Sequence, residues 1–308
     1  MLKASIDIGS NSILLLICED SNGEIKVLEN HSYVTGLGRN LDDNNEFLQT
    51  AMDESLSVLI KYSDIVANYK IPLFEVLATA TEASRVALNA DLFYKRVKNE
   101  AGIGVCIISS EAEAYYSTIG ILADKKITDK NIVIMDIGGA STEIIKVECR
   151  EKYIESSFSM PVGAVRMNNW RENETQDVKL HEIYKNFEDQ IKSVQCDKLY
   201  CVAGTMTSVG NMYLGNAHFM ESDVNGLELL VADVDKMLLD YGDYGADDFL
   251  KKYPFLGKRS QTIKSGLHLA TKVFEWLNVS SLYVSTYGLR YGTLLEGALR
   301  DEFIIKRF

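Results

Sequence analysis

The segment Ala4–Ser12, ASIDIGSNS, recurs later in the chain as Val133–Ser141, VIMDIGGAS. In both copies an apolar run ends in an aspartate, passes a glycine-containing turn and restarts as a second apolar run, at 13–19 and at 142–147. This pattern is typical of a β-hairpin, because Gly, Asn and Ser favour tight turns. Two copies with aspartate and glycine in register predict two related domains, each opening with a hairpin.

Alternating strands and helices are expected after each hairpin. In the first half we expect strands at 25–33, 73–80 and 104–108 and helices at 46–68, 91–100 and 110–122, with Ser110 as a helix N-cap. In the second half we expect strands at 153–159, 199–202 and 282–284, with helices near 165, at 178–194, after 204 and from 289. Each half is therefore predicted to be a mixed sheet covered by helices, with ligands at the carboxyl ends of its strands.

The polar stretch 123–130 marks the expected domain boundary. The predicted domains are 1–124, carrying the first loop, and 125–308, carrying the second. The last helix is free to pack back on the first domain.

The composition limits the classes of function. The chain has 308 residues, enough for two cores, and its net charge of −12 argues against general affinity for nucleic acid or anionic membranes. The five cysteines are odd in number and lack C-x-x-C spacing, which favours a reduced, cytoplasmic setting over disulfides or a zinc site. The early apolar run Ile13–Cys18 is too short for a membrane span or an export signal.

The two glycine-containing turns are candidate phosphate-binding loops. Successive backbone N–H groups in such a turn hold phosphate oxygens, and the preceding aspartate is placed to hold a divalent cation directly or through water. One D-x-G turn is more often a plain β-turn, but the duplication favours a pair that faces one substrate. The candidate phosphate contacts in these turns are Ser10, Asn11, Ser12, Gly138, Gly139, Ala140 and Ser141.

Segments along nearly the whole chain resemble the exopolyphosphatase and guanosine pentaphosphate phosphatase (Ppx/GppA) family. DIGSNS at 7–12 and DIGGASTE at 136–143 are similar to its paired phosphate motifs. The other matches are ATEASRVALN at 80–89 with A-T-S-A-x-R-x-A-x-N, ISSEAEA at 108–114 with I-S-G-x-E-E-A, MPVGAVR at 160–166 with L-P-x-G-A-V-R, AGTMT at 203–207 with a glycine-threonine turn, and STYGLR at 285–290 with S-x-x-G-L-R. The family lies in the superfamily of actin, sugar kinases and heat-shock ATPases (ASKHA). The resemblance therefore implies an α/β fold of two actin-like, ribonuclease H-like domains with an interdomain cleft.

The resemblance also implies a role for individual residues. It places the catalytic glutamate on Glu113 rather than Glu111, and the substrate-phosphate arginine on Arg85. Both roles suit the chemistry, because a partly desolvated carboxylate serves as a general base and a guanidinium takes phosphate oxygens bidentately. Gly204 and Thr205 join the phosphate contacts. The implied ligands for magnesium or manganese are Asp136 and Glu143, with Asp7 as a direct or an indirect partner. This small set suffices because magnesium keeps several waters.

The chain departs from the family pattern at several positions. Ala140 adds a methyl group where the backbone approaches phosphate, which is tolerated at a negative φ and obstructive at a positive one. Ala112 replaces the first glutamate of the E-E pair, Ser110 replaces its glycine, and Tyr291 replaces the usual glutamate after G-L-R. LGRN at 37–40 stands where the family has L-G-E-G. The proposed base, arginine and metal carboxylates are retained.

The predicted function is a cytoplasmic, metal-dependent phosphohydrolase. It would release terminal orthophosphate from inorganic polyphosphate or from guanosine pentaphosphate. Short polyphosphate chains are included, because the additional helical C-terminal region of longer family members is not found in this sequence. Two alternatives stay open. The first is a superfamily kinase or ATPase, which needs an adenosine-binding glycine pair late in the second half, where only Gly204-Thr205 appears. The second is a non-catalytic sensor that binds a guanosine alarmone or polyphosphate. A homodimer is compatible with the resemblance, although the sequence offers no heptad seam for one.

Overall fold

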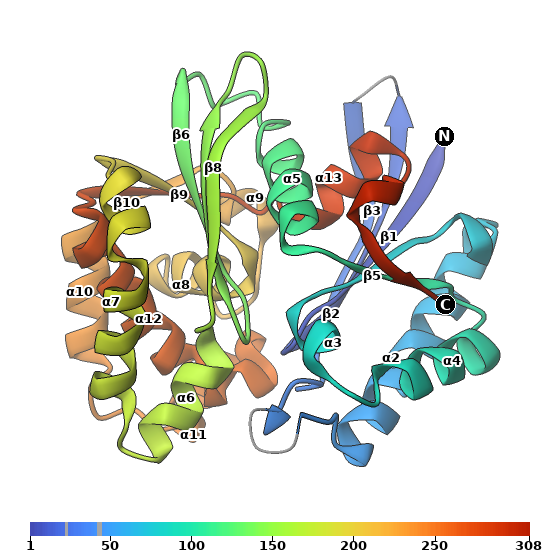
Figure 1. Ribbon diagram of the computed structural model, residues 1–308, viewed down its shortest axis with the longest axis horizontal. Helices are drawn as coiled ribbons and strands as arrows, with labels where there is room; N and C mark the ends of the chain where they lie inside the picture. The colour runs from blue at the N-terminus through green and yellow to red at the C-terminus, as the bar shows by residue number, and fades with distance from the viewer. Residues whose placement is uncertain (22–23, 42–44) are drawn as a thin grey trace. The chain divides into compact units, whose positions relative to one another are not determined.

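The computed structural model describes residues 1–21, 24–41 and 45–308, which form two compact units (Figure 1). Unit 1 comprises residues 1–120 and 288–308, and unit 2 comprises residues 121–287. Each unit contains one six-stranded sheet with both parallel and antiparallel pairs, and helices pack against it. The α/β fold with two mixed sheets that the sequence predicted is confirmed.

Among its described residues, unit 1 contains one six-stranded sheet and five α-helices. Its strands are β1 (Leu2–Ile8), β2 (Ser12–Ser21), β3 (Glu24–Val34), β4 (Leu77–Ala80), β5 (Val105–Ile108) and β12 (Ile304–Arg307). Its helices are α2 (Gln49–Asn68), α3 (Glu82–Val86), α4 (Ala90–Ala101), α5 (Ser110–Ile121) and α13 (Leu289–Glu296), with 3-10 turns η1 (Leu73–Glu75) and η3 (Asp301–Phe303).

Unit 2 repeats this arrangement with more helices. Its strands are β6 (Asn131–Ile137), β7 (Thr142–Glu148), β8 (Tyr153–Met160), β9 (Lys198–Val202), β10 (Leu227–Leu230) and β11 (Ser281–Val284). Its helices are α6 (Ala164–Glu172), α7 (Gln176–Ser193), α8 (Ala203–Tyr213), α9 (Glu221–Val224), α10 (Val231–Asp240), α11 (Ala246–Lys252) and α12 (Ile263–Leu277), with the 3-10 segment η2 (Pro254–Gln261). None of the described helices is both long and apolar enough to span a membrane.

The two sheets have the same topology. The strand order is β12-β5-β4-β1-β2-β3 in unit 1 and β10-β11-β9-β6-β7-β8 in unit 2, so β1 and β6 occupy equivalent central positions. Strand β1 pairs antiparallel with β2 and parallel with β4, and β6 pairs antiparallel with β7 and parallel with β9. In each unit the parallel partner is reached by a crossover connection. This shared order is the structural counterpart of the two similar sequence segments.

Side-chain alternation in the central strands fixes where the two motif aspartates point. Ile6 and Ile8 are buried in the core of unit 1, and Met135 and Ile137 are buried in the core of unit 2. Successive side chains of a strand point to opposite faces of the sheet. The aspartate between each apolar pair therefore lies on the face away from that core.

The C-terminal segment belongs to unit 1. Strand β12 pairs antiparallel with β5, with Ile304 opposite Ile108, and α13 packs against β1 and β2. The expected domain ranges of 1–124 and 125–308 therefore need adjusting, because residues 288–308 return to the first unit. The first crossing between the units lies at 120/121 rather than 124/125.

Two local predictions need correction. Residues 73–75 form η1 rather than the start of a strand, because the Pro72 carbonyl accepts the N–H of Glu75 at 2.9 Å and closes a turn there. Helix α5 is capped by Ser109 rather than Ser110, since the Ser109 hydroxyl accepts the N–H of Ala112 at 3.2 Å. Strands β10 and β12 were not predicted, because four residues at a sheet edge carry too little alternation.

Helices α5 and α13 cross with their backbones in contact, and they lie side by side in Figure 1. A Cβ atom added at Gly292 would lie 1.8 Å from the carbonyl oxygen of Tyr116, and one added at Gly120 would lie 2.2 Å from that of Gly288. Neither helix has room to yield, because the obstructing atoms belong to the backbone. Glycine at both positions is therefore a packing requirement of unit 1.

We predict that Gly292→Ala destabilises the protein by about 2–3 kcal/mol, because the methyl group forces the two helices apart. The free energy of unfolding in urea measures the loss. Gly210→Ala in α8 is the matched control, since the nearest atoms to an added Cβ there are side-chain methyl carbons at 3.3 Å and beyond. Equal stabilities of the two variants would contradict the proposed crossing.

Candidate functional site

Arg85 and Glu113 form an ion pair in unit 1. Arg85 lies on α3, which follows β4, and Glu113 lies on α5, which follows β5. Strands β4 and β5 are parallel neighbours, so their carboxyl ends bring the two helices together at one edge of the sheet. The Arg85 Nη1 group donates to Glu113 Oε1 and, at 2.8 Å, to the carbonyl oxygen of Ile108. The structure thus joins the two residues predicted as the arginine and the base.

The pair is largely enclosed, with 15% of the Arg85 side chain and 12% of the Glu113 side chain exposed. Burial works to lower the pKa of Arg85, but the carboxylates of Glu113 and Glu82 outweigh it and raise that pKa. Backbone and Ser109 hydrogen bonds lower the pKa of Glu111, and the charge of Arg85 adds to this effect. Three carboxylates therefore lie in the field of one guanidinium.

Glu82 was missed by the sequence reasoning. Its Oε2 accepts a hydrogen bond from Arg85 Nη2 at 2.9 Å. The available signal was the i,i+3 spacing of Glu82 and Arg85, which places both on the same side of a helical turn.

The first loop lies at the same sheet edge as Arg85. The Gly9 N–H donates to the Ser12 carbonyl at 3.0 Å, which closes the turn between β1 and β2. The Ser10 carbonyl accepts the N–H of Gly38 at 2.8 Å, and a Cβ on Gly38 would lie 3.2 Å from that of Ala83 on α3. Within residues 1–21, 24–41 and 45–308, no backbone hydrogen bond occupies the N–H of Ser10 or Asn11. These predicted phosphate contacts therefore present donors for an anion.

The second loop is built in the same way in unit 2. The Gly138 N–H donates to the Ser141 carbonyl at 3.0 Å, and the carbonyls of Gly138 and Gly139 accept the first N–H groups of α6. A Cβ on Gly163 would lie 2.5 Å from the Gly139 carbonyl carbon, so α6 begins directly on the loop. Among the described residues, the N–H groups of Gly139 and Ala140 have no backbone partner.

The departures from the family pattern are accommodated by the fold. Ala140 is absent from the described non-glycine residues with positive φ, so its methyl group causes no left-handed strain. Ala112 is fully buried and Tyr291 is 1% exposed, so both fill the core of unit 1 instead of lining a surface.

A third turn lies beside the second loop. Helix α8 begins directly after β9, the parallel neighbour of β6, and the Thr205 hydroxyl donates to the Ile137 carbonyl at 3.0 Å. A Cβ on Gly204 would lie 2.4 Å from Nη2 of Arg259, whose Nη1 donates to the Ser208 hydroxyl at 3.0 Å. Burial lowers the pKa of Arg259 to about 10, which leaves the guanidinium charged at neutral pH. Sequence reasoning placed Gly204 and Thr205 here but gave Arg259 no specific position.

Ala203, which opens α8, is in the left-handed region at φ +66°. Left-handed backbone costs a residue other than glycine roughly 1–3 kcal/mol and persists where the surrounding structure imposes it. This strained backbone at the carboxyl end of β9 supports a functional interpretation of the turn.

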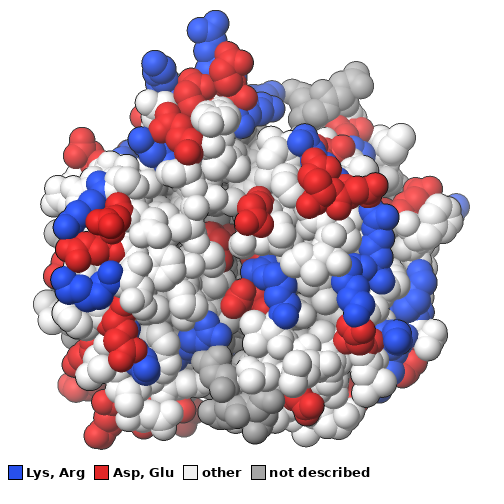
Figure 2. All heavy atoms as spheres, in the orientation of Figure 1, with Lys and Arg blue, Asp and Glu red and all other residues white. Residues whose placement is uncertain are grey.

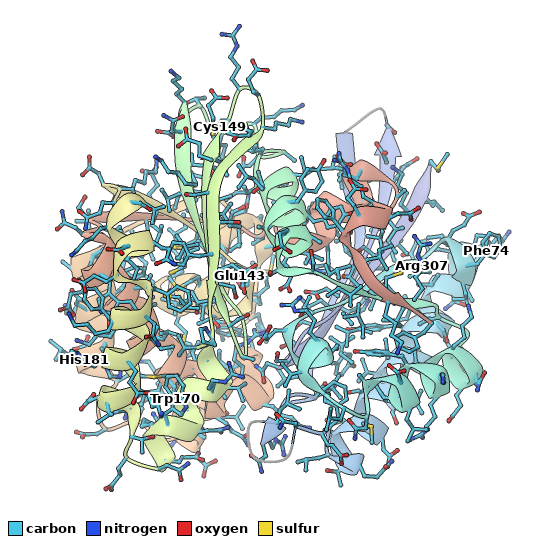
Figure 3. All side chains as sticks on the ribbon, viewed as in Figure 1. Phe74, Glu143, Cys149, Trp170, His181 and Arg307 are labelled. Carbon is cyan, nitrogen blue, oxygen red and sulfur yellow. The ribbon has the colours of Figure 1, made fainter. Side chains whose placement is uncertain are left out.

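Two carboxylates of unit 2 face the same side of its sheet. Asp136 on β6 lies directly opposite Glu143 on β7, and directly opposed residues point to the same face. Glu143 is 5% exposed, and its Oε1 accepts a hydrogen bond from the Ser159 hydroxyl at 2.8 Å. Figure 3 shows Glu143 on β7, remote from Cys149 at the other end of the hairpin.

This pair fits a magnesium ion, which takes one or two carboxylates and fills its remaining positions with water and phosphate oxygens. No group of three or more His, Cys, Asp or Glu that could hold a metal occurs in the described part of the chain. The structure therefore brings together two carboxylates of unit 2, and a magnesium site there stays a prediction.

Asp7, the third predicted metal ligand, belongs to unit 1. Its Oδ1 atom is buried and has no hydrogen-bond partner among the described residues. Burial raises the pKa of Asp7 to about 6, against an opposing effect of the Arg290 charge. A buried carboxylate oxygen without a partner is costly unless a cation or an ordered water satisfies it, so Asp7 fits the predicted role.

Asp7 gives a pH test of this site. Since its pKa is higher in the folded than in the unfolded chain, its contribution to stability is fully present below about pH 4 and is lost as the pH rises through about 6. We predict that Asp7→Asn, in buffer containing a metal chelator, stabilises the protein by on the order of 2–3 kcal/mol at pH 7.5 and by much less at pH 4. Urea unfolding at both pH values measures this difference. Asp189→Asn, at an exposed position of α7, is the control, and a pH-independent effect of Asp7→Asn would refute the burial argument.

Comparisons with known proteins show which chains this one is similar to. The bifunctional 3-dehydroquinate synthase/phosphatase of Fusobacterium nucleatum is 28% identical over 96% of this chain and 46% of its own length. The guanosine-5'-triphosphate,3'-diphosphate pyrophosphatase of Vibrio vulnificus is 27% identical over 99% of this chain and 61% of its own length. The chain therefore spans about half to three fifths of these curated relatives.

A solved structure shows the same fold. The exopolyphosphatase from Cytophaga hutchinsonii superposes with a TM-score of 0.86 at 23% identity, over 97% of this chain and 99% of the other. Residues 16–301 match the Ppx/GppA phosphatase family as a whole. Since that match covers most of the sequence, this chain belongs to the Ppx/GppA phosphatase family.

Proposed function

We propose that this chain is a phosphohydrolase that releases the terminal phosphate of a phosphoanhydride in the cytoplasm. The observation that carries the proposal is the enclosed pair of Arg85 and Glu113 at the carboxyl ends of β4 and β5. Inorganic polyphosphate, short chains included, and guanosine pentaphosphate are the proposed substrates. The similarity to a pyrophosphatase and to an exopolyphosphatase supports this class of reaction.

Arg85 is the proposed contact to the phosphate that is transferred. Its guanidinium offers donors in a planar fork that matches two phosphate oxygens, and its raised pKa keeps the charge in place. The N–H groups of Ser10 and Asn11 add donors at the same sheet edge. Together they would stabilise the charge that develops on the phosphoryl oxygens in the transition state.

Glu113 is the proposed general base. Its Oε1 is bound to Arg85, so the arginine that holds the phosphate also orients the carboxylate. Glu113 would take a proton from a water molecule as the water attacks the terminal phosphorus in line with the leaving oxygen. This route requires no phosphorylated enzyme intermediate.

A divalent cation, magnesium or manganese, completes the proposal. Asp136 and Glu143 of unit 2 would hold it, and the partnerless Oδ1 of Asp7 is a separate candidate contact for a cation within unit 1. When bound, such a cation offsets negative charge on the phosphate oxygens.

We predict that Glu113→Gln lowers kcat by about 10²–10⁴, because the amide does not accept the proton of the attacking water. Binding of tripolyphosphate to the variant, measured by calorimetry, is retained because Arg85 is unchanged. Glu111→Gln on the same helical turn is the control and is expected to lose far less activity. Near-normal turnover by Glu113→Gln would remove Glu113 from the role of base.

Metal removal and a substrate panel test the reaction itself. We expect phosphate release from short polyphosphate or guanosine pentaphosphate with magnesium, loss of release with a chelator, and little release from ATP. Tight binding of these compounds without phosphate release would instead select a sensor.

Asp136→Asn should raise the magnesium concentration needed for half-maximal activity by about tenfold or more, since one of two carboxylates loses its charge.

A further inference from the structure

Glu82 holds a donor of Arg85 that a phosphate would need. The two arms of the Arg85 guanidinium have different partners: Nη1 is bound to Glu113 and the Ile108 carbonyl, and Nη2 is bound to Glu82 at 2.9 Å. Three of the five guanidinium N–H donors of Arg85 are therefore engaged by protein acceptors before any ligand arrives.

Of these acceptors, Glu82 is the one that can leave at least cost. The Ile108 carbonyl is fixed in β5, and the Glu113 side chain is 12% exposed. The Glu82 side chain is 23% exposed and lies in the first turn of the five-residue helix α3. A more exposed carboxylate regains more hydration when its ion pair breaks, so its release is less costly.

Glu82 also sets the local charge. Arg85 carries one positive charge, and Glu82 and Glu113 contact it with two negative charges. Glu111 adds a further negative charge within the field of Arg85. An approaching phosphate therefore meets a net negative group of side chains, and departure of Glu82 removes one of its three negative charges. Positive and negative side chains are interspersed on the visible face of the molecule (Figure 2).

We propose that Glu82 is an affinity-determining counter-ion that Arg85 exchanges for the terminal phosphate. This inference rests on the proposed function and names a residue that regulates binding at the same site. A polyphosphate held by further contacts can displace Glu82, whereas a single orthophosphate, with fewer contacts, displaces it poorly. Glu82 thereby weakens retention of the orthophosphate product, at the cost of weaker substrate binding.

The test is to replace Glu82 by Gln, which keeps the size of the side chain and removes its charge. We expect the KM for tripolyphosphate and the inhibition constant of inorganic phosphate each to fall by about three- to tenfold, with a smaller effect on kcat. Glu82→Asp, which keeps the charge on a shorter side chain, should lie between wild type and Glu82→Gln. Glu100→Gln, which removes the i,i+4 partner of Arg96 elsewhere in unit 1, should match wild type.

The outcomes separate this inference from the proposed function. If wild-type protein hydrolyses tripolyphosphate and Glu82→Gln leaves both constants unchanged or raises them, Glu82 is not the counter-ion. If Glu82→Gln folds poorly, Glu82→Ser is measured in its place, with the thermal unfolding temperature as the folding check and the same changes expected. If wild-type protein neither binds tripolyphosphate by calorimetry nor hydrolyses it, the proposed function fails and this inference fails with it.

Discussion

Side-chain alternation at the ends of two central strands is the constraint on which the site depends. An aspartate between two buried apolar residues cannot enter the core, so it must occupy the opposite face as the strand reaches its turn. Asp7 and Asp136 both meet this condition. Because β1 runs parallel to β4 and β6 runs parallel to β9, the turn after each aspartate lies beside the carboxyl end of that neighbour. Helices α3 and α8 start at these carboxyl ends. In each unit the other candidate site residues lie on loops, helices and strand ends at this same end of the sheet.

The duplicated units share this frame but carry different chemistry. In unit 1 the residue opposite Asp7 is Leu14, whereas in unit 2 the residue opposite Asp136 is Glu143. Unit 2 therefore presents a carboxylate pair suited to a cation, and unit 1 presents one partnerless carboxylate oxygen. Unit 1 instead supplies the arginine–glutamate pair at the ends of β4 and β5. The two units thus share one strand order but differ in the side chains that they offer to the proposed reaction: a carboxylate pair in unit 2 and an arginine–glutamate pair in unit 1.

Sequence patterns predicted the duplicated hairpins and the longer helices of the first unit, but they gave no helix between 214 and 281, where α10 and α12 lie. Helix α2 and the hairpins were found within a few residues of their true ends, because their apolar periodicity is long. The pairing of Arg85 with Glu113 depended on the motif resemblance, since it arises from two strands becoming parallel neighbours. Features that depend on tertiary structure were missed: Glu82 on Arg85, Arg259 against Gly204, and the positive φ of Ala203. Nothing in an alanine's own chemistry signals a left-handed backbone.

The return of residues 288–308 to unit 1 has a consequence for how the protein is made. Strand β12 and helix α13 are parts of the first unit, yet they are synthesised after the whole of unit 2. The sheet of unit 1 therefore stays without its outer strand, and the backbone groups of β5 on that side stay unpaired, throughout synthesis of unit 2. Unit 2, which is continuous in the chain, has its whole sequence available earlier. Biosynthesis thus favours completion of the second unit before the first, and the half that carries Arg85 and Glu113 is completed only after all of unit 2 has been synthesised.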